Sequence, residues 1–412
     1  MLVTRRIWIF SLVLAGNLFV SSADWNQWRG PNRDGKIESS AAPAQWPKEL
    51  NRRWKVEVGE GHSSPIIVGD RVFIFTRQGD DEVARCLELA TGKEVWRQSY
   101  PAPYEMNAYA KEHGKGPKST PVCAEGRLYT FGISGILSCF DAKSGQVLWR
   151  HEFLKQFKLT SPIYGTAMSP LLDGDLLITH VGGHDAGALT AFDAKTGDVR
   201  WRWDGDGPSY ASPIITTIGG VRQVVTQSQK LCVGVTVESG KLLWSIPFTT
   251  DYDQNIVTPI VVGDLVVFGG SEQPTVACRV RKVGDQWTTE KVWETKDATL
   301  YMSTPVVSSR WLYGMSQKRA GQMFSLDVAT GKVEWKGEGK FGKNATVFDT
   351  GPMLLALATD SRLHVFKKDG AALTEVACYQ VSDTPTWASP AFAGRRVLVK
   401  DKTALAMWEV PE

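Results

Sequence analysis

Residues 90–96 read Ala-Thr-Gly-Lys-Glu-Val-Trp, and residues 142–149 repeat the pattern as Ala-Lys-Ser-Gly-Gln-Val-Leu-Trp. A period of roughly 40–50 residues built from short strands is typical of a radial array of repeated units. An aromatic residue ends eight such segments along this chain: Trp54, Trp96, Trp149, Trp201, Trp244, Trp293, Trp335 and Tyr379. Because a tryptophan buries a large apolar surface, we predict that these residues pack between neighbouring units and bind no ligand.

Each unit also has a characteristic start. A Ser-Pro or Thr-Pro pair opens an apolar segment at Pro65, Pro121, Pro170, Pro213, Pro259, Pro305 and Pro390, and residues 345–347 form a degenerate eighth start. Proline is tolerated at the first residue of a strand, where no ladder hydrogen bond is lost. Short apolar runs then alternate with Gly-Asp and Thr-Gly turns, as in antiparallel hairpins. Four such strands make one blade of a β-propeller.

The phase of the repeat predicts how the ring closes. Trp54 has no three strands before it, whereas residues 389–410 contain three strand patterns and no fourth. The N-terminal strand therefore completes the last blade. We predict an all-β fold, an eight-bladed β-propeller of four-stranded antiparallel blades over residues 54–412, and seven blades are the alternative.

Two segments precede the propeller. Arg5 and Arg6, the apolar run 7–20 and the small residues 21–23 have the pattern of a bacterial signal peptide, which predicts export to the periplasm or the outside. The apolar run is short for a membrane span, so no transmembrane segment is expected in the mature chain, and a membrane anchor is the alternative. Residues 24–53 are polar and rich in glycine and proline, and we predict an arm that packs along the propeller outside the ring.

Charge and cysteine content exclude several classes of protein. The net charge is +3 and no basic run is present, which argues against nucleic acid as a partner. The cysteines form no CxxC or CxxCH motif, so metal-ribbon, c-type haem and thioredoxin-like classes lack support. We expect a monomer with buried free thiols at Cys86, Cys123, Cys139, Cys232, Cys278 and Cys378.

The units resemble the pyrroloquinoline-quinone (PQQ) repeat family, whose units open with Ser/Thr-Pro and end in Ala-x-Thr-Gly-Lys-x-x-Trp. The ending is matched at residues 90–96, 142–149, 194–201 and 329–335, and the resemblance covers residues 54–410. It implies the propeller fold. The arm at 28–35 is also similar to exported bacterial members. Since the family includes quinoprotein dehydrogenases and an outer-membrane assembly lipoprotein, the fold does not define the function.

Three features that the resemblance implies for a dehydrogenase have no match: an adjacent-cysteine disulfide, a calcium-binding cluster of carboxylates and amides, and a catalytic aspartate. A lipidated cysteine near the predicted cleavage site is also missing. We therefore predict an exported, non-catalytic binding or protein-interaction scaffold whose partner is a protein or a small molecule. The alternative is a PQQ-dependent quinoprotein oxidoreductase of alcohols or sugars, with PQQ as its cofactor.

The innermost strand of a propeller blade lines the axial channel, so residues just before each Ser/Thr-Pro are expected to ring its mouth. Three residues before each proline, or its equivalent, lie His62, Lys118, Ala167, Tyr210, Ile256, Met302, Asn344 and Trp387, and one residue earlier lie Asn255, Tyr301 and Lys343. Aromatic rings beside cations stack on and neutralise a planar anion. The predicted ligand-binding residues are His62, Lys118, Tyr210, Asn255, Tyr301, Lys343, Asn344 and Trp387; polar lining of a wet channel is the alternative.

Other candidate features are weaker. The insertion 100–118 is the longest loop between blades, and long loops on a rigid scaffold often carry function. A merely solvated loop is the alternative. His180 and His184 lie four residues apart around two glycines, but no third ligand beyond Asp185 converges on them in the sequence. No metal site and no catalytic residue are predicted.

Overall fold

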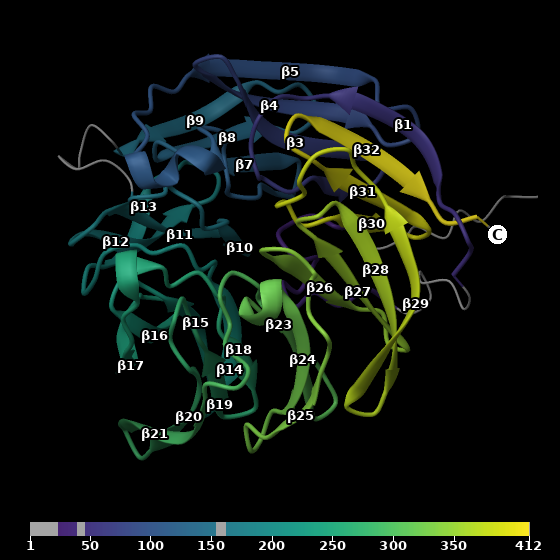
Figure 1. The fold of residues 1–412 in the computed structure, drawn as a ribbon. Coiled ribbons are helices and arrows are strands. Elements are labelled where there is room, and N and C mark those ends of the chain that lie inside the picture. The colour runs from purple at the N-terminus through teal and green to yellow at the C-terminus, as the bar shows by residue number, and fades with distance from the viewer. Residues whose placement is uncertain (1–23, 39–45, 154–161, 412) are drawn as a thin grey trace, which may run out of the picture.

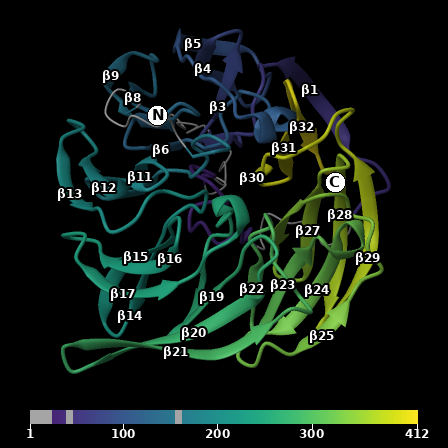
Figure 2. The same cartoon turned by 60° about the vertical axis from the view of Figure 1, so that its left-hand side comes forward.

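The structure, a computed structural model, describes residues 24–38, 46–153 and 162–411. The predicted signal peptide, residues 1–23, lies outside these ranges. The described residues form eight four-stranded antiparallel sheets that follow one another around a ring (Figures 1 and 2). No helix within these ranges is long and apolar enough to cross a membrane.

The first four blades follow one another in the chain. Blade 1 contains β2 (Ile66–Val68), β3 (Arg71–Gln78), β4 (Asp81–Glu88) and β5 (Glu94–Pro101). Blade 2 contains β6 (Val122–Ala124), β7 (Arg127–Phe131), β8 (Ile136–Asp141) and β9 (Val147–Glu152). Blade 3 contains β10 (Leu171–Asp173), β11 (Leu176–Gly183), β12 (Ala186–Asp193) and β13 (Val199–Trp203). Blade 4 contains β14 (Ile214–Ile218), β15 (Val221–Gln227), β16 (Leu231–Thr236) and β17 (Leu242–Pro247).

The remaining blades complete the ring. Blade 5 contains β18 (Ile260–Val262), β19 (Leu265–Phe268), β20 (Thr275–Val283) and β21 (Gln286–Thr295). Blade 6 contains β22 (Val306–Ser308), β23 (Trp311–Ser316), β24 (Gln322–Asp327) and β25 (Val333–Lys336). Blade 7 contains β26 (Ala345–Asp349), β27 (Met353–Ala358), β28 (Arg362–Asp369) and β29 (Ala372–Gln380). Blade 8 contains β30 (Ala391–Ala393), β31 (Arg396–Lys400), β32 (Ala404–Glu409) and β1 (Asn51–Glu57).

The predicted closure of the ring is confirmed. The N-terminal strand β1 pairs antiparallel with the C-terminal strand β32, so the two ends of the propeller meet in blade 8 (Figure 1). Pairing begins at Asn51, which is opposite Glu409, three residues before the predicted start of the propeller at Trp54. Closure removes the exposed sheet edges that an open array would leave at its two ends.

The Ser or Thr before each proline connects neighbouring blades. Its backbone N–H donates to the hydroxyl of the equivalent residue in the next blade at 2.9–3.3 Å, in the pairs Ser64–Thr120, Thr120–Ser169, Ser169–Ser212, Ser212–Thr258, Thr258–Thr304 and Ser389–Ser64. These buried amides have no strand partner of their own, so a side-chain oxygen must satisfy them. This requirement explains why the repeat keeps Ser or Thr at that position.

The tryptophans pack between blades, as the repeat predicts. The indole Nε1 of Trp96 in blade 1 donates to the carbonyl of Ala142 in blade 2 at 2.9 Å. The Trp96 ring also packs directly on Gly145, in the Ser-Gly turn of blade 2. A side chain at position 145 would not fit there, because its Cβ would lie only 2.6 Å from the Trp96 ring. The same indole-to-carbonyl bond into the next blade is made by Trp54, Trp149, Trp201 and Trp293.

Trp244 is the exception among the indole donors. It donates to the side chain of Gln223 within its own blade. The next blade has the long hairpin β20–β21 in place of the short turn, and nothing lies within 4 Å of a Cβ built on its turn residue Gly284. The inter-blade hydrogen bond of the indole therefore depends on the short turn of the following blade, whereas the Trp244 ring still belongs to one buried cluster with Val266 and Phe268 of blade 5.

Cys378 departs from the expectation of buried thiols. The other five cysteines are buried and free, whereas Cys378 lies exposed on β29. Strand β29 is the last strand of its blade, and the side chains on one of its faces meet solvent.

The expectation that the arm packs outside the ring is wrong for residues 24–38, whereas Trp46 packs on Tyr379 of the outer strand β29. Residues 24–38 run across one end of the axial channel, where the purple stretch lies at the centre of the ring in Figure 2. Trp25 pairs with Ile67 of blade 1 and contacts Phe348 and Phe392 of blades 7 and 8. Lys36 bridges to Asp349 of blade 7. We call residues 24–37 the floor.

Two buried arginines hold the floor in place. Arg29 donates to the carbonyls of Thr304, Pro305 and Val347 at 3.1, 3.0 and 3.2 Å. Across the channel, Arg33 donates to the carbonyls of Ser169 and Pro170. The Cζ atoms of Arg29 and Arg33 lie 5.6 and 5.4 Å from the centroid of the Trp28 ring. Because these carbonyls lie on the innermost strands of blades 3, 6 and 7 or just before them, the arm joins opposite sides of the ring.

The insertion after β5 covers the other end of the channel. It contains the short helix η2 (Ala108–His113), and Pro117 accepts hydrogen bonds from the amides of His62 and Ser63. Tyr109 packs on Tyr252 across the ring at 5.9 Å between ring centroids. We call residues 102–118 the roof.

Glu82 of blade 1 makes folding stability sensitive to pH. Its carboxylate accepts from the amide of Ile133 in blade 2 at 2.7 Å and from the Tyr100 hydroxyl at 3.1 Å. Burial, only partly offset by these hydrogen bonds, raises the pKa of Glu82 from 4.5 to about 7. The folded state therefore holds a proton that the unfolded state loses above its own pKa of 4.5, and stability falls as pH rises from about 4.5 to about 7.

We expect this loss to be on the order of 3 kcal/mol for Glu82. Because glutamine stays neutral, Glu82→Gln removes the effect. Urea unfolding at pH 5 and pH 7.5 should show a smaller fall in stability for the variant than for the wild type. The exposed Glu290→Gln is the control and should follow the wild type. Equal falls in the wild type and Glu82→Gln would show that Glu82 is ionised in both states.

Candidate functional site

A cavity of about 200 Å³ lies on the axis of the ring between the floor and the roof. Trp28 and Arg29 form its base, and His113 of η2 closes it from the other end. Its walls come from residues just before the innermost strands, including the Ser and Thr residues that connect the blades. The volume is below the roughly 300–1,000 Å³ of pockets for drug-sized ligands. A single small ring system is therefore the size of ligand that fits.

The predicted register of the channel lining is confirmed in every blade. The residue three before each proline, or its equivalent, lines the cavity: His62, Lys118, Ala167, Tyr210, Ile256, Met302, Asn344 and Trp387. The proline fixes where the innermost strand begins, so the same offset points the same way in each repeat.

Three of the predicted binding residues do not line the cavity. A shift of one residue along an extended chain turns the side chain to the opposite side. The amide of Asn255 is buried and donates to the carbonyls of Ser228, Gln229 and Phe248, so it has a structural role.

Tyr301 and Lys343 are the other two residues outside the cavity lining. Tyr301 is half-buried. Lys343 is exposed at the rim, where its ammonium group pairs with Glu112 of the roof at 3.4 Å. Lys343 therefore supplies a cation near the cavity without contacting it.

Two cations define the charge of the cavity. Burial lowers the pKa of Lys118 to about 8, and its ammonium group donates to the carbonyl of Tyr164. Burial also lowers the pKa of Arg29 to about 10, so Arg29 remains charged at neutral pH. No aspartate or glutamate is among the described residues that line the cavity. The cavity therefore favours an anion.

The histidines of the site are neutral. Burial and then the nearby Lys118 lower the pKa of His62 to about 3, and its Nε2 lies 2.9 Å from the carbonyl of His113, to which it donates. Burial and Lys118 also lower the pKa of His113. Neither imidazole is charged at neutral pH, so both contribute polar ring edges.

Aromatic rings surround the upper part of the cavity. His113 meets Trp387 edge-on at 5.5 Å between ring centroids, and Tyr164 meets Tyr210 edge-on at 5.7 Å. Rings in this arrangement present apolar faces and edges to a planar guest. Together with Lys118 and Arg29, they form a site that suits a small, flat, negatively charged molecule.

The donor set does not fit the calcium-dependent PQQ site of quinoprotein dehydrogenases. Calcium takes six to eight oxygen ligands, with carboxylates prominent among them. The described lining of the cavity offers no carboxylate. The cavity also lacks a carboxylate to act as a general base. The hydroxyls of Ser64, Thr120 and Ser169 already accept hydrogen bonds from neighbouring blades. The geometry therefore supports binding.

Sequence reasoning missed Trp28, Arg29, His113, Tyr164 and Gln254 of the lining. These residues come from the arm and from the loops that cover the roofed end, and no repeat offset places them. The aromatic and basic residues of the arm and of the 100–118 insertion were the only signal for Trp28, Arg29 and His113, and no signal pointed to Tyr164 or Gln254.

The closed ring, the Ser/Thr-Pro starts and the tryptophan between blades define a PQQ-like β-propeller. The chain belongs to the family described as outer membrane protein assembly factor BamB, whose profile matches residues 79–337.

The similarity to individual proteins is distant. BamB of Shewanella oneidensis is 23% identical over 299 residues, which are 68% of this chain and 60% of that protein. The crystal structure of BamB from Moraxella catarrhalis superimposes with a TM-score of 0.61 at 14% identity, over 87% of this chain and 97% of that one. Quinohemoprotein alcohol dehydrogenase from Comamonas testosteroni gives a TM-score of 0.64 at 13% identity, over 94% and 82%. These structural matches show the fold alone, since assembly factor and dehydrogenase share it.

Proposed function

We propose that this protein is an exported propeller scaffold that binds a protein partner and performs no catalysis. The observation that supports this proposal is the composition of the axial cavity, whose described lining has no carboxylate, neutral histidines and hydroxyls already engaged in hydrogen bonds. Membership of the BamB family supports the same class of function, since that family is named for assembly factors.

The roofed face is the proposed partner surface. Tyr109 and Tyr252 are 71% and 56% exposed there, and their rings pack together across the ring of blades. Aromatic side chains are enriched at protein interfaces, where they supply large contact area with few rotatable bonds. Glu112 and Lys343 beside them provide a polar rim.

Site-specific photocrosslinking in cells tests the scaffold proposal. A photoreactive amino acid at position 109 is expected to give a covalent adduct of defined mass with one protein. The control position is Val283, which is 63% exposed on the β20–β21 hairpin, and it should give no adduct. Failure of position 109 to crosslink, or equal crosslinking at position 283, would remove the support for the roofed face as a partner surface.

The cavity supports a second function, the binding of a small planar anion. Lys118 is expected to donate a charge-assisted hydrogen bond to such a ligand. Lys118→Met should therefore weaken the binding of a pyridine dicarboxylate, a single flat ring with two carboxylates, by about 10–100-fold. Because the pKa of Lys118 is about 8, affinity should fall as pH rises through that value.

Calorimetry with a pyridine dicarboxylate measures this effect. Lys343→Met is the matched control, because Lys343 lies at the rim and does not line the cavity. Its affinity should stay close to that of the wild type. Unchanged affinity in Lys118→Met, or no binding of the dicarboxylate to the wild type, would contradict the anion site.

A further inference from the structure

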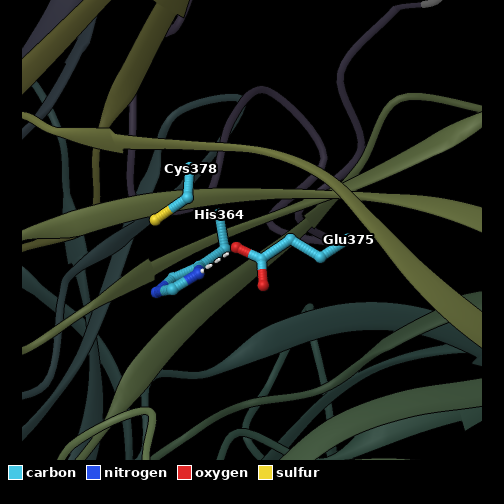
Figure 3. Close-up of side chains that lie close together, drawn as sticks. All are labelled: His364, Glu375 and Cys378. Carbon is cyan, nitrogen blue, oxygen red and sulfur yellow. Dashed lines mark hydrogen bonds and ion pairs between the residues drawn. The ribbon is translucent and has the colours of Figure 1, made fainter.

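His364, Glu375 and Cys378 on blade 7 come together away from the axial cavity (Figure 3). One potential ligand atom from each side chain lies within 4.8 Å of the other two. His364 lies on β28, and the other two residues lie on β29. We propose that these three side chains bind a zinc ion. This zinc site does not depend on the proposed scaffold function.

The strand pairing places the three donors on one face. His364 and Cys378 are directly opposite each other in the β28–β29 ladder. The register shifts between Val365 and Phe366, so that Phe366 is opposite Glu375 and Val376 is left without a partner. Such a bulge redirects the side chains that follow it. In a regular ladder Glu375 would point to the other face, and the bulge brings it beside His364.

The imidazole is held in place and has unused coordinating capacity. Its Nδ1 lies 2.9 Å from Oε1 of Glu375. Phe341 contacts it edge-on at 4.8 Å between ring centroids, and Phe366 stacks on it at 6.1 Å. The His364 side chain is only 6% exposed, and its Nε2 is buried without a hydrogen-bond partner. A buried nitrogen without a partner is costly to the fold unless a ligand binds it.

The other two donors are open to solvent. Cys378 is a free, exposed thiol, and the Glu375 side chain is 41% exposed. An ion therefore reaches the site without opening the blade. The buried imidazole on one side and the two exposed donors on the other give the site a fixed base and an accessible mouth.

The donor set selects the metal. A thiolate, an imidazole and a carboxylate are the ligand types that zinc takes in proteins, and three protein ligands leave a fourth tetrahedral position for water. On binding, the Cys378 thiol releases its proton to solvent and its sulfur bonds to the ion. His364 contributes the lone pair of Nε2 and keeps the proton on Nδ1, while the exposed Glu375 side chain gives up its contact with Nδ1 and contributes a carboxylate oxygen. No electron is transferred.

Metal titration of the reduced full-length protein tests this proposal. Zinc should bind with one equivalent, and cobalt(II) in its place should give the near-ultraviolet charge-transfer band of a cobalt–thiolate bond. Cys378→Ser should abolish that band and lower zinc affinity by at least about tenfold, because even losing an outer-shell partner costs that much. Glu375→Gln should keep the band and also weaken zinc binding.

Both replaced side chains are exposed, so the variants are expected to fold as the wild type does, which a thermal melt checks. Glu290→Gln is the matched control, an exposed glutamate on the outer strand β21 of the other long hairpin, and it should leave zinc binding unchanged. No zinc binding by the reduced wild type, or zinc binding that Cys378→Ser leaves unchanged, would overturn the assignment.

Discussion

Replacing Arg29 with methionine is expected to lower the free energy of unfolding by about 3 kcal/mol or more. The guanidinium group is buried at the base of the axial cavity and satisfies the carbonyls of Thr304, Pro305 and Val347. Methionine fills most of the volume but offers no donor, so the three carbonyls lose a charged hydrogen-bond donor at a buried position. Each unpaired buried acceptor costs about 1–3 kcal/mol.

Chemical denaturation of Arg29→Met beside Lys36→Met measures this effect. Lys36 lies in the same arm with an exposed side chain, and its backbone bridge to Asp349 is retained in the variant. We expect Lys36→Met to change stability by less than about 0.5 kcal/mol, as is usual at the surface. A similarly small change in Arg29→Met would mean that the arm does not close the channel.

Replacing Trp201 with alanine is expected to cost about 3–5 kcal/mol, the usual range for a large core truncation. The Trp201 side chain is 8% exposed, donates to the carbonyl of Val237 at 2.8 Å and packs over Gly240 of the next blade. A Cβ on that glycine would lie 2.3 Å from the indole ring. Alanine removes the apolar contact and leaves a cavity between blades 3 and 4.

Two further variants separate packing from hydrogen bonding at this position. Trp201→Phe keeps an aromatic ring but loses the indole donor, so it should cost less than alanine does. Val199→Ala is the control, because Val199 is 52% exposed on the same strand, β13. Thermal and urea unfolding should order the losses as Trp201→Ala, Trp201→Phe and Val199→Ala. A loss below about 1 kcal/mol for Trp201→Ala would contradict the inter-blade role.

The fold could be predicted because its determinants are local and repeated. The turn before Trp96 and the proline at position 65 each act within a few residues, and eight copies of such signals define one blade after another. The phase of Trp54 relative to the C-terminal strands was enough to predict closure in blade 8, which the β1–β32 pairing confirms. Side-chain direction three residues before the proline followed from the same register.

The ends of the cavity could not be predicted in this way. Arg29 bonds to Val347, 318 residues away in the chain, and no repeat rule relates the arm to blade 7. The roof has the same difficulty, since Lys343 meets Glu112 across 231 residues. Asn255 shows the opposite error, because a polar residue near the channel serves the protein's own backbone.

The cluster of His364, Glu375 and Cys378 was hidden for a different reason. The three residues lie on a single hairpin, but a regular ladder would place Glu375 on the face opposite Cys378. The bulge at Val376 reverses that outcome, and a one-residue register shift leaves no clear mark in a sequence of alternating side chains.

A reconstitution assay tests most directly the claim that the protein is a binding scaffold without quinone-dependent catalysis. The purified protein is incubated with PQQ and calcium, and dye-linked oxidation of alcohols and sugars is followed. Because the described lining offers no carboxylate for calcium or for proton abstraction, and the cavity of about 200 Å³ suits a single small ring, we predict no turnover above the PQQ-free control. PQQ- and calcium-dependent turnover would contradict the account and establish a quinoprotein oxidoreductase.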